Sequence, residues 1–202
     1  MMSTSMVRRR VPRPGSLLET LNTSRHGAAL AIYGIVVLLH WVEHLAQAAQ
    51  IYLWDWPIPE AGGALGLVFP SLVQNELLHY GFALIMIVAF FMLRHGFTGR
   101  SRTWWGIALG IQFWHHIEHL LLLIQSWSGA YLLGKSVPTS MIQLLIPRVE
   151  LHLLYNAIVF APMVVAMVLH RRATTAEQAM MRCDCAHPPA RRDRRASARA
   201  SV

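Results

Sequence analysis

The sequence predicts an all-α integral membrane protein, a bundle of four transmembrane helices built from two repeated helical hairpins. Three observations predict this class. Hydrophobic residues make up 54% of the 202-residue chain and charged residues only 14%. The net charge of +8 belongs to the two ends, because residues 1–26 hold five arginines and one glutamate and residues 171–202 hold eight arginines and three acids. The apolar middle of the chain also repeats a histidine motif.

Four apolar segments between the charged ends are long enough to cross a hydrocarbon core, which takes about 20 helical residues. The predicted spans are 27–50, 72–93, 104–125 and 149–170. The chain therefore divides into a basic N-terminal segment (1–26), a transmembrane domain (27–170) and a basic tail (171–202). The tail is expected to be disordered because it is rich in Arg, Pro, Ala and Ser. The first span is expected to be retained, since the basic, proline-bearing segment before it is unlike a cleaved signal peptide.

Arginines near the ends of spans set the orientation of a membrane protein. The loop 94–102 holds three arginines, whereas the loop 51–71 holds none. We therefore expect a multi-pass protein of the cell membrane with both termini in the cytoplasm. The expected partners are membrane lipid and either a second copy of the chain or a larger membrane complex. The basic tail is interpreted as a topology signal and a lipid-attracting segment rather than as a nucleic-acid-binding one.

An internal repeat joins the two halves of the membrane domain. HWVEHLAQ (40–47) in the first span and HHIEHLLL (115–122) in the third both contain H-x-x-E-H, at an offset of about 75 residues. The second span opens with NELLHYGFALI (75–85) and the fourth with VELHLLYNAIV (149–159), each with Glu and His beside a tyrosine. The first and third spans run in one direction, so the two hairpins would be related by an axis along the membrane normal.

Histidine and glutamate recur at one depth in all four spans, in the predicted outer half of the bilayer. Within a helix, residues three and four apart share a face. These residues are therefore expected to meet in the interior of the bundle. The predicted metal ligands are His40, Glu43, His44, Glu76, His79, His115, Glu118, His119 and His152. Glu150 and His116 lie off these faces, and their membership of the site is left open.

Ionisable groups within a membrane carry a free-energy cost of several kcal/mol and usually pair. These stripes contain no lysine or arginine, so a bound cation is expected to balance the glutamates. Imidazole and carboxylate suit iron, copper, zinc and manganese, and six histidines with several glutamates exceed a simple zinc site. The favoured function is a metal-dependent oxidoreductase holding iron or copper, with the glutamates bridging metals or orienting histidines. Tyr80 or Tyr155 would donate a proton or an electron.

Other functions fit the same residues. A metal-ion carrier, a sensor or an accessory subunit would bind and release an ion at the site. Facing histidines could ligate haem, Glu43 or Glu118 could serve as the base of a zinc hydrolase, and the polar set could be purely structural. The tail segment CDCAH (183–187) offers two thiols and His187 to a soft metal, if it is ordered.

Overall fold

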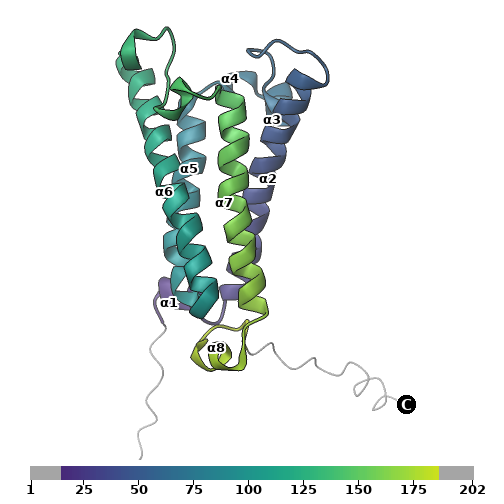
Figure 1. Ribbon diagram of the computed structural model, residues 1–202, viewed down its shortest axis with the longest axis vertical. Coiled ribbons are helices and arrows are strands. Elements are labelled where there is room, and N and C mark those ends of the chain that lie inside the picture. Colours follow the sequence, from purple (N-terminus) through teal and green to yellow (C-terminus); the bar gives the residue numbers. More distant parts are fainter. Residues whose placement is uncertain (1–14, 187–202) are drawn as a thin grey trace, which may run out of the picture.

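Residues 15–186 are described by the computed structural model, and among them every regular element is a helix. Four long helices form an antiparallel bundle (Figure 1): α2 (His26–Tyr52), α5 (Glu76–Leu93), α6 (Gly99–Ser128) and α7 (Arg148–Arg171). All four are long and apolar enough to cross a membrane. The predicted all-helical architecture with four candidate membrane spans is therefore confirmed.

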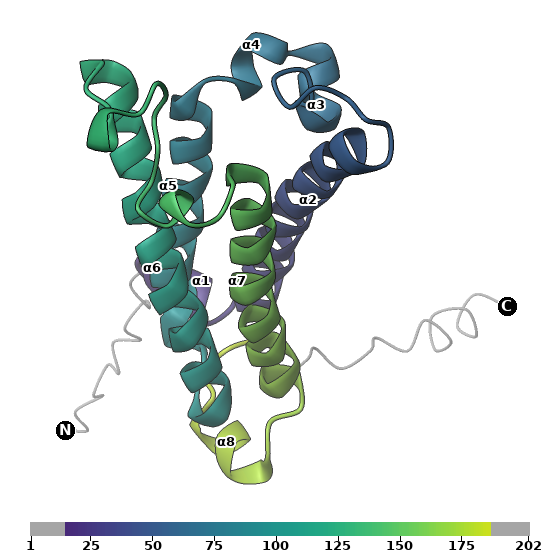
Figure 2. The same cartoon turned by 45° about the horizontal axis from the view of Figure 1, so that its top comes forward.

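Short helices lie at both ends of the bundle. One end, here called the base, carries α1 (Leu17–Asn22), the 3-10 helix η1 (Arg94–Gly96) and α8 (Thr175–Met180). The other end, here called the loop end, carries α3 (Gly63–Val68), α4 (Pro70–Val73), η2 (Leu132–Gly134) and η3 (Ile142–Leu144). Figure 2 shows α3 and α4 crossing from the top of α2 to the top of α5.

The ends of the long helices follow local signals in the sequence. The second long helix begins at Glu76 rather than at the expected residue 72, because Asn75 is extended (φ −86°, ψ 123°) and caps the helix. The Asn75 side chain accepts a hydrogen bond of 2.8 Å from the backbone N–H of Leu77, which satisfies one free donor of the first turn. The third long helix ends before Gly129, whose left-handed backbone (φ 68°) stops it.

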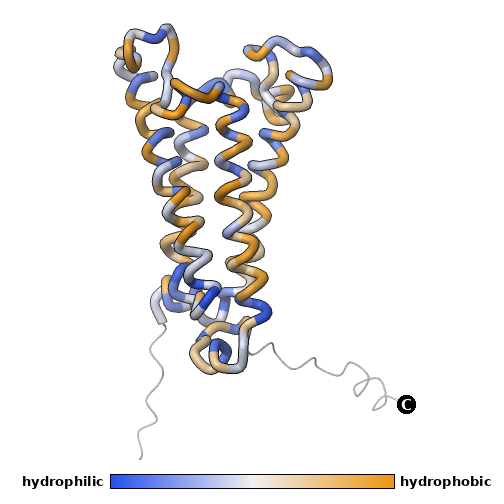
Figure 3. The backbone as a smooth tube through the Cα atoms, viewed as in Figure 1, coloured by the Kyte–Doolittle hydropathy of each residue, from blue (hydrophilic) through white to orange (hydrophobic). Residues whose placement is uncertain are grey.

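The outward faces of the long helices are apolar. Ile32, Leu39 and Ile85 are more than half exposed, at 66%, 64% and 56%. Figure 3 shows hydrophobic residues along much of the bundle and hydrophilic residues gathered at the base. Large exposed apolar surfaces mark contact with lipid or with another protein, which agrees with the spans expected from the sequence.

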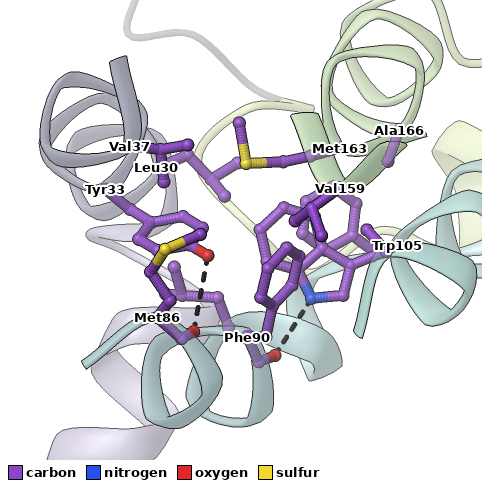
Figure 4. Close-up of a cluster of buried hydrophobic side chains, with 12 residues drawn as sticks. Leu30, Tyr33, Val37, Met86, Phe90, Trp105, Val159, Met163 and Ala166 are labelled. Atoms are coloured by element: carbon purple, nitrogen blue, oxygen red, sulfur yellow. Dashed lines mark hydrogen bonds between the residues drawn. The ribbon is translucent and has the colours of Figure 1, made fainter. Parts of the chain in front are cut away.

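The hydrophobic core occupies the base half of the bundle (Figure 4). Trp105 of α6 is buried there, and its indole N–H donates a hydrogen bond of 3.0 Å to the carbonyl oxygen of Phe90. Ala108 of α6 and Ala166 of α7 are fully buried, and such small residues let helix backbones approach closely. The loop-end half of the interior contains most of the buried histidines.

Candidate metal centre

Six histidines from four helices gather in the loop-end half of the bundle. They come from α2 (His40, His44), α5 (His79), α6 (His115, His119) and α7 (His152). The His152 ring lies at the middle of the group, with its centroid 5.1 Å from that of His44, 5.2 Å from His119, 5.8 Å from His115 and 6.1 Å from His79. The His40 ring joins through His44, at 4.7 Å. These six residues are here called the histidine cluster, and the structure brings together every histidine that the sequence proposed as a ligand.

Hydrogen bonds at Nδ1 orient three of these imidazoles. The Nδ1 atom of His152 lies 2.7 Å from the carbonyl oxygen of Arg148, and that of His79 lies 3.3 Å from the carbonyl oxygen of Asn75. The Nδ1 atom of His44 is 3.4 Å from Oε1 of Gln47, one turn along α2. A carbonyl oxygen only accepts, so the neutral ring carries its proton on Nδ1 and its lone pair on Nε2. This arrangement is typical of metal-binding histidines.

The two histidines of α6 face each other. The Nε2 atoms of His115 and His119 are 3.2 Å apart. Two nitrogens bound at about 2.1 Å to one ion, about 100° apart, would be separated by about 3.2 Å. The Nδ1 atoms of both rings and Nε2 of His152 are buried without a hydrogen-bond partner. The pair therefore has the spacing of two ligands of a single ion.

The ligand atoms of the histidine cluster do not all converge on one position for an ion. Among residues 15–186, three donor atoms of His, Cys, Asp or Glu lie within 4.8 Å of one another only at the base of the bundle. An ion bound at the loop end would contact His115 and His119 as they stand. The His152 ring, whose centroid is 5.8 Å from that of His115 and 5.2 Å from that of His119, would have to move to join them.

Glu76 pairs with an arginine. Its two carboxylate oxygens accept hydrogen bonds of 2.5 and 2.7 Å from Nη1 and Nη2 of Arg148, the bidentate geometry that is strongest for this pair. The expectation that no fixed positive charge balances the glutamates is therefore wrong for Glu76. The sequence assigned Arg148 to a loop, whereas it is the first residue of α7 and reaches across to α5.

Glu43 and Glu118 hold the chain at the loop end. Oε1 of Glu43 accepts a hydrogen bond of 2.6 Å from the backbone N–H of Leu65 in α3. Oε1 of Glu118 accepts bonds of 3.0 Å from the backbone N–H of Ile142 and 3.1 Å from the hydroxyl of Ser140. All three glutamates of the predicted ligand set thus have protein partners. One oxygen each of Glu43 and Glu118 thus positions a loop and Glu76 positions α7, while Oε2 of Glu118 is buried without a hydrogen-bond partner.

Gln125 fastens the loop that follows α6. Its Oε1 accepts hydrogen bonds from the backbone N–H groups of Leu132 (2.8 Å) and Thr139 (3.3 Å), and its Nε2 donates to the carbonyl oxygen of Thr139 (2.9 Å). Gln50 of α2 makes the same pair of contacts with Gly63, donating at 3.0 Å and accepting at 2.7 Å. One glutamine in each half therefore ties the following loop to the bundle above the histidine cluster.

A Gln125→Leu variant is expected to lose about 2 kcal/mol of local stability in residues 130–140, because buried N–H groups are left without an acceptor. Hydrogen exchange of the backbone amides of Leu132 and Thr139 in detergent should become about tenfold faster or more. Gln74→Leu is the matched control, since the exposed Gln74 makes one long bond of 3.4 Å. Equal exchange in the two variants would contradict this role of Gln125.

The remaining candidates lie around the cluster. The Tyr155 ring of α7 lies 4.2 Å from that of His115, and its hydroxyl is buried without a partner. The Tyr80 ring instead lies 5.2 Å from that of His116. Glu150 is exposed and accepts a hydrogen bond from the hydroxyl of Tyr52. Of the two tyrosines proposed as donors, the structure places only Tyr155 against the histidine cluster.

A second group of donor atoms lies at the base of the bundle. His170, Cys183 and Cys185 bring one ligand atom each to within 4.8 Å of the other two. The two thiols were considered from the sequence, but with His187, which lies outside the described residues. The third member is His170, in the last turn of α7. A histidine near the end of a helix, followed by a C-x-C segment, is the signal that would have found it.

The chain matches no protein-family model, no curated protein and no solved structure at a significant level. Function therefore has to be inferred from the residues and their geometry.

Proposed function

We propose that this chain is an integral membrane metalloprotein whose histidine cluster holds one or two iron or copper ions, and that it acts as an oxidoreductase. The observation that carries the proposal is the meeting of six imidazoles from four separate helices in one network, four of them buried and two half-buried. No single helix needs such a set for packing. Convergence from all four helices is the way that helical bundles build metal sites.

The donor set fits such an ion. Several buried imidazole nitrogens of the cluster lack a partner, among them Nε2 of His152 and Nδ1 of His115 and His119. Each unsatisfied buried group costs about 1 to 3 kcal/mol, and an ion bound at Nε2 of His152 would remove that cost for this atom. Imidazole suits iron, copper, zinc and nickel, and no cysteine lies in this half of the bundle among the described residues.

The chemistry follows from where the ligands lie. A bound iron or copper ion would exchange single electrons with oxygen or another small oxidant. His44, His115, His119 and His152 are buried, so the protein excludes bulk water from the site. The Tyr155 hydroxyl, beside His115, is the group placed to hand over a proton. Glu43 and Glu118 would orient the loops beside the site and Glu76 would orient α7 through Arg148, while the free Oε2 of Glu118 would be available to an ion.

We infer that the two helical hairpins are structural repeats of each other. Glu43 and Glu118 stand 75 residues apart, as do Gln50 and Gln125. Each glutamate accepts from a backbone N–H of the following loop, and each glutamine makes a two-way contact with that loop. These matched contacts support the sequence repeat. In this proposal the connection that contains α3 and the connection that contains η3 cover the two sides of the site in the same way.

We further propose that the base of the bundle lies on the cytoplasmic side of the membrane. The histidine cluster would then lie in the half of the bundle nearer the outside of the cell. Several arginines belong to the base: Arg94 in η1, Arg100 and Arg102 in the first turn of α6, and Arg171 and Arg172 at the end of α7. Basic residues at the ends of spans are retained on the cytoplasmic side. Substrates of the site would then be small molecules that arrive from outside the cell or along the membrane.

A metal-ion carrier is the second candidate, because a further set of ligand atoms lies at the base. The interior between the two sites argues against ion passage. It holds Phe90 and Ala108 at 0% exposure and Trp105 and Met163 at 1%. An ion would have to cross this apolar region, so we favour a fixed site.

Metal analysis of purified protein tests the proposed function. A Cys183→Ser/Cys185→Ser background removes the thiols at the base, so that any bound iron or copper reports on the histidine cluster. In that background we expect about one or two iron or copper ions per chain, and about tenfold less after His119→Ala/His152→Ala. The absorption or paramagnetic spectrum of the bound ion should change on reduction.

His116→Ala is the matched control, because His116 is next to His115 in sequence but its ring pairs with Tyr80. This variant should keep its metal. Protein that contains no iron, copper, zinc or manganese would overturn the proposal. Zinc that binds at the cluster but never changes oxidation state would overturn the oxidoreductase and favour the carrier.

A further inference from the structure

The base of the bundle carries a compact set of soft and borderline ligands. The sulfur of Cys183 lies 3.4 Å from Nε2 of His170, and the sulfur of Cys185 completes a triangle whose sides are all within 4.8 Å. Around a tetrahedral ion with sulfur at about 2.3 Å and nitrogen at about 2.1 Å, neighbouring ligand atoms are separated by about 3.5 to 3.8 Å. The three donors need only small movements to meet this geometry.

The C-D-C turn is held in place by the residue between the two cysteines. The backbone N–H of Asp184 donates a hydrogen bond of 2.9 Å to the carbonyl oxygen of Thr23, and its carboxylate accepts one of 2.9 Å from the backbone N–H of Gly27. The N–H of Ala186 returns to the carbonyl oxygen of Cys183 at 3.2 Å. The chain therefore turns back at this point and presents both sulfurs to α7.

A second anchor fixes the helix before the turn. Glu177 of α8 closes a capping box with Thr174. Its carboxylate also accepts three hydrogen bonds of 3.0 Å from Arg100 at the start of α6, one from the backbone N–H and two from the guanidinium group. These contacts keep the pKa of Glu177 well below its usual range, chiefly because Arg100 bonds the ionised form. The segment from α7 to the C-D-C turn is thus tied to α6 and to α2 without the help of an ion.

The burial of the three donors suits a bound ion. Cys183 and His170 are each 2% exposed, while Cys185 is half-buried. Such a site has an inner wall formed by α7 and a single accessible side at Cys185.

We propose that His170, Cys183 and Cys185 bind one thiophilic d10 ion, Zn²⁺ or Cu⁺, at the base of the bundle. Thiolates select these ions among the common metals. Three protein ligands leave a fourth coordination position for water or for a ligand atom of another molecule. Structural zinc sites differ, because four protein ligands close them. The ion would clamp α8 and the C-D-C turn onto the last turn of α7, and this site is independent of the histidine cluster.

Cobalt(II) binding to the reduced, metal-free protein in detergent tests this site. Cobalt replaces zinc in such sites, and its thiolate-to-metal charge-transfer absorption arises only when sulfur is bound. We expect one such cobalt per chain, displaced by Zn²⁺, and loss of this absorption in Cys183→Ser/Cys185→Ser. A His170→Gln variant should bind cobalt at least about tenfold more weakly. The control is His119→Ala/His152→Ala, which removes ligands of the other cluster and should keep the absorption.

A second experiment tests Cu⁺ binding. The same proteins are incubated with Cu⁺ and a competing chelator, and the alkylation of the two thiols is measured. Protection of both thiols from alkylation by Cu⁺, without a cobalt signal, would assign the site to Cu⁺. If neither ion protects the thiols and cobalt gives no sulfur absorption, the proposal is overturned. The histidine cluster contains no sulfur, so success or failure at one site is read separately from the other.

Discussion

A Gly96→Ala variant is expected to unfold with a free energy about 3 kcal/mol below that of the native chain, because the added methyl group overpacks a closed site. It would lie 2.3 to 2.6 Å from three atoms of the His26 ring. The ring cannot easily turn away. It is fully buried, its centroid is 5.3 Å from that of Phe97 and 5.2 Å from that of His170, and its Nδ1 lies 3.0 Å from the carbonyl oxygen of Leu21.

A backbone shift would not relieve the clash at low cost either. The N–H of Gly96 donates a hydrogen bond of 2.7 Å to Asn22, whose amide donates in turn to the carbonyl oxygen of Met92 at 2.7 Å. Unfolding in a detergent and denaturant titration measures the loss. Gly106→Ala is the matched control, since nothing lies within 4 Å of its added methyl group, and alanine within a helix should gain about 0.5 to 1 kcal/mol.

The clash can be assigned to His26 by a double-mutant cycle. Gly96→Ala should cost much less in a His26→Ala background, where the ring is absent, than in the native chain. The two substitutions would then be strongly non-additive, as expected for residues in contact. Additive losses would show that the Gly96 effect has another origin.

An Arg148→Met variant is expected to lose about 3 kcal/mol of unfolding free energy, since removal of one partner strands a buried charge. The Glu76 side chain is 8% exposed and would lose both of its bonds. We place the loss at the low end of the range for buried pairs because the Arg148 side chain is 38% exposed. The same detergent titration measures it.

The double variant Arg148→Met/Glu76→Gln is the control for this prediction. It removes the stranded charge, so it should recover most of the stability that Arg148→Met loses. Arg148→Lys should fall between the two, because an ammonium group cannot make the bidentate contact. Equal stability of Arg148→Met and the double variant would show that Glu76 is not the source of the loss.

Much of the helical framework can be predicted from local sequence. Hydropathy over a span of about 20 residues finds the four long helices. The spacing of His40 and His44, and of His115 and His119, puts each pair on one face of a helix. The second long helix begins at Glu76, later than the predicted residue 72, because Asn75 acts as a cap within an apolar stretch. Hydropathy does not detect such a hydrogen bond.

The partners of the polar side chains were not predictable in the same way. Arg148 and Glu76 are 72 residues apart, and the sequence placed the arginine in a loop outside the polar stripes. The thiols of the tail were paired with the nearby His187, whereas the fold brings them to His170, the last residue of the fourth predicted span. In each case the partner was chosen by proximity in sequence, and the fold chose one that is close in space.

The sequence by itself determined how many long apolar helices the chain forms and at which level each carries its histidines, because hydropathy and helical periodicity are local properties. Only the tertiary structure decided that Arg148 neutralises Glu76, that Glu43 and Glu118 hold the loops, and that His170 meets the C-D-C turn. The physical reason is that a buried charge or lone pair is satisfied by whichever group the packed helices bring within hydrogen-bonding distance, however far apart the two residues stand along the chain.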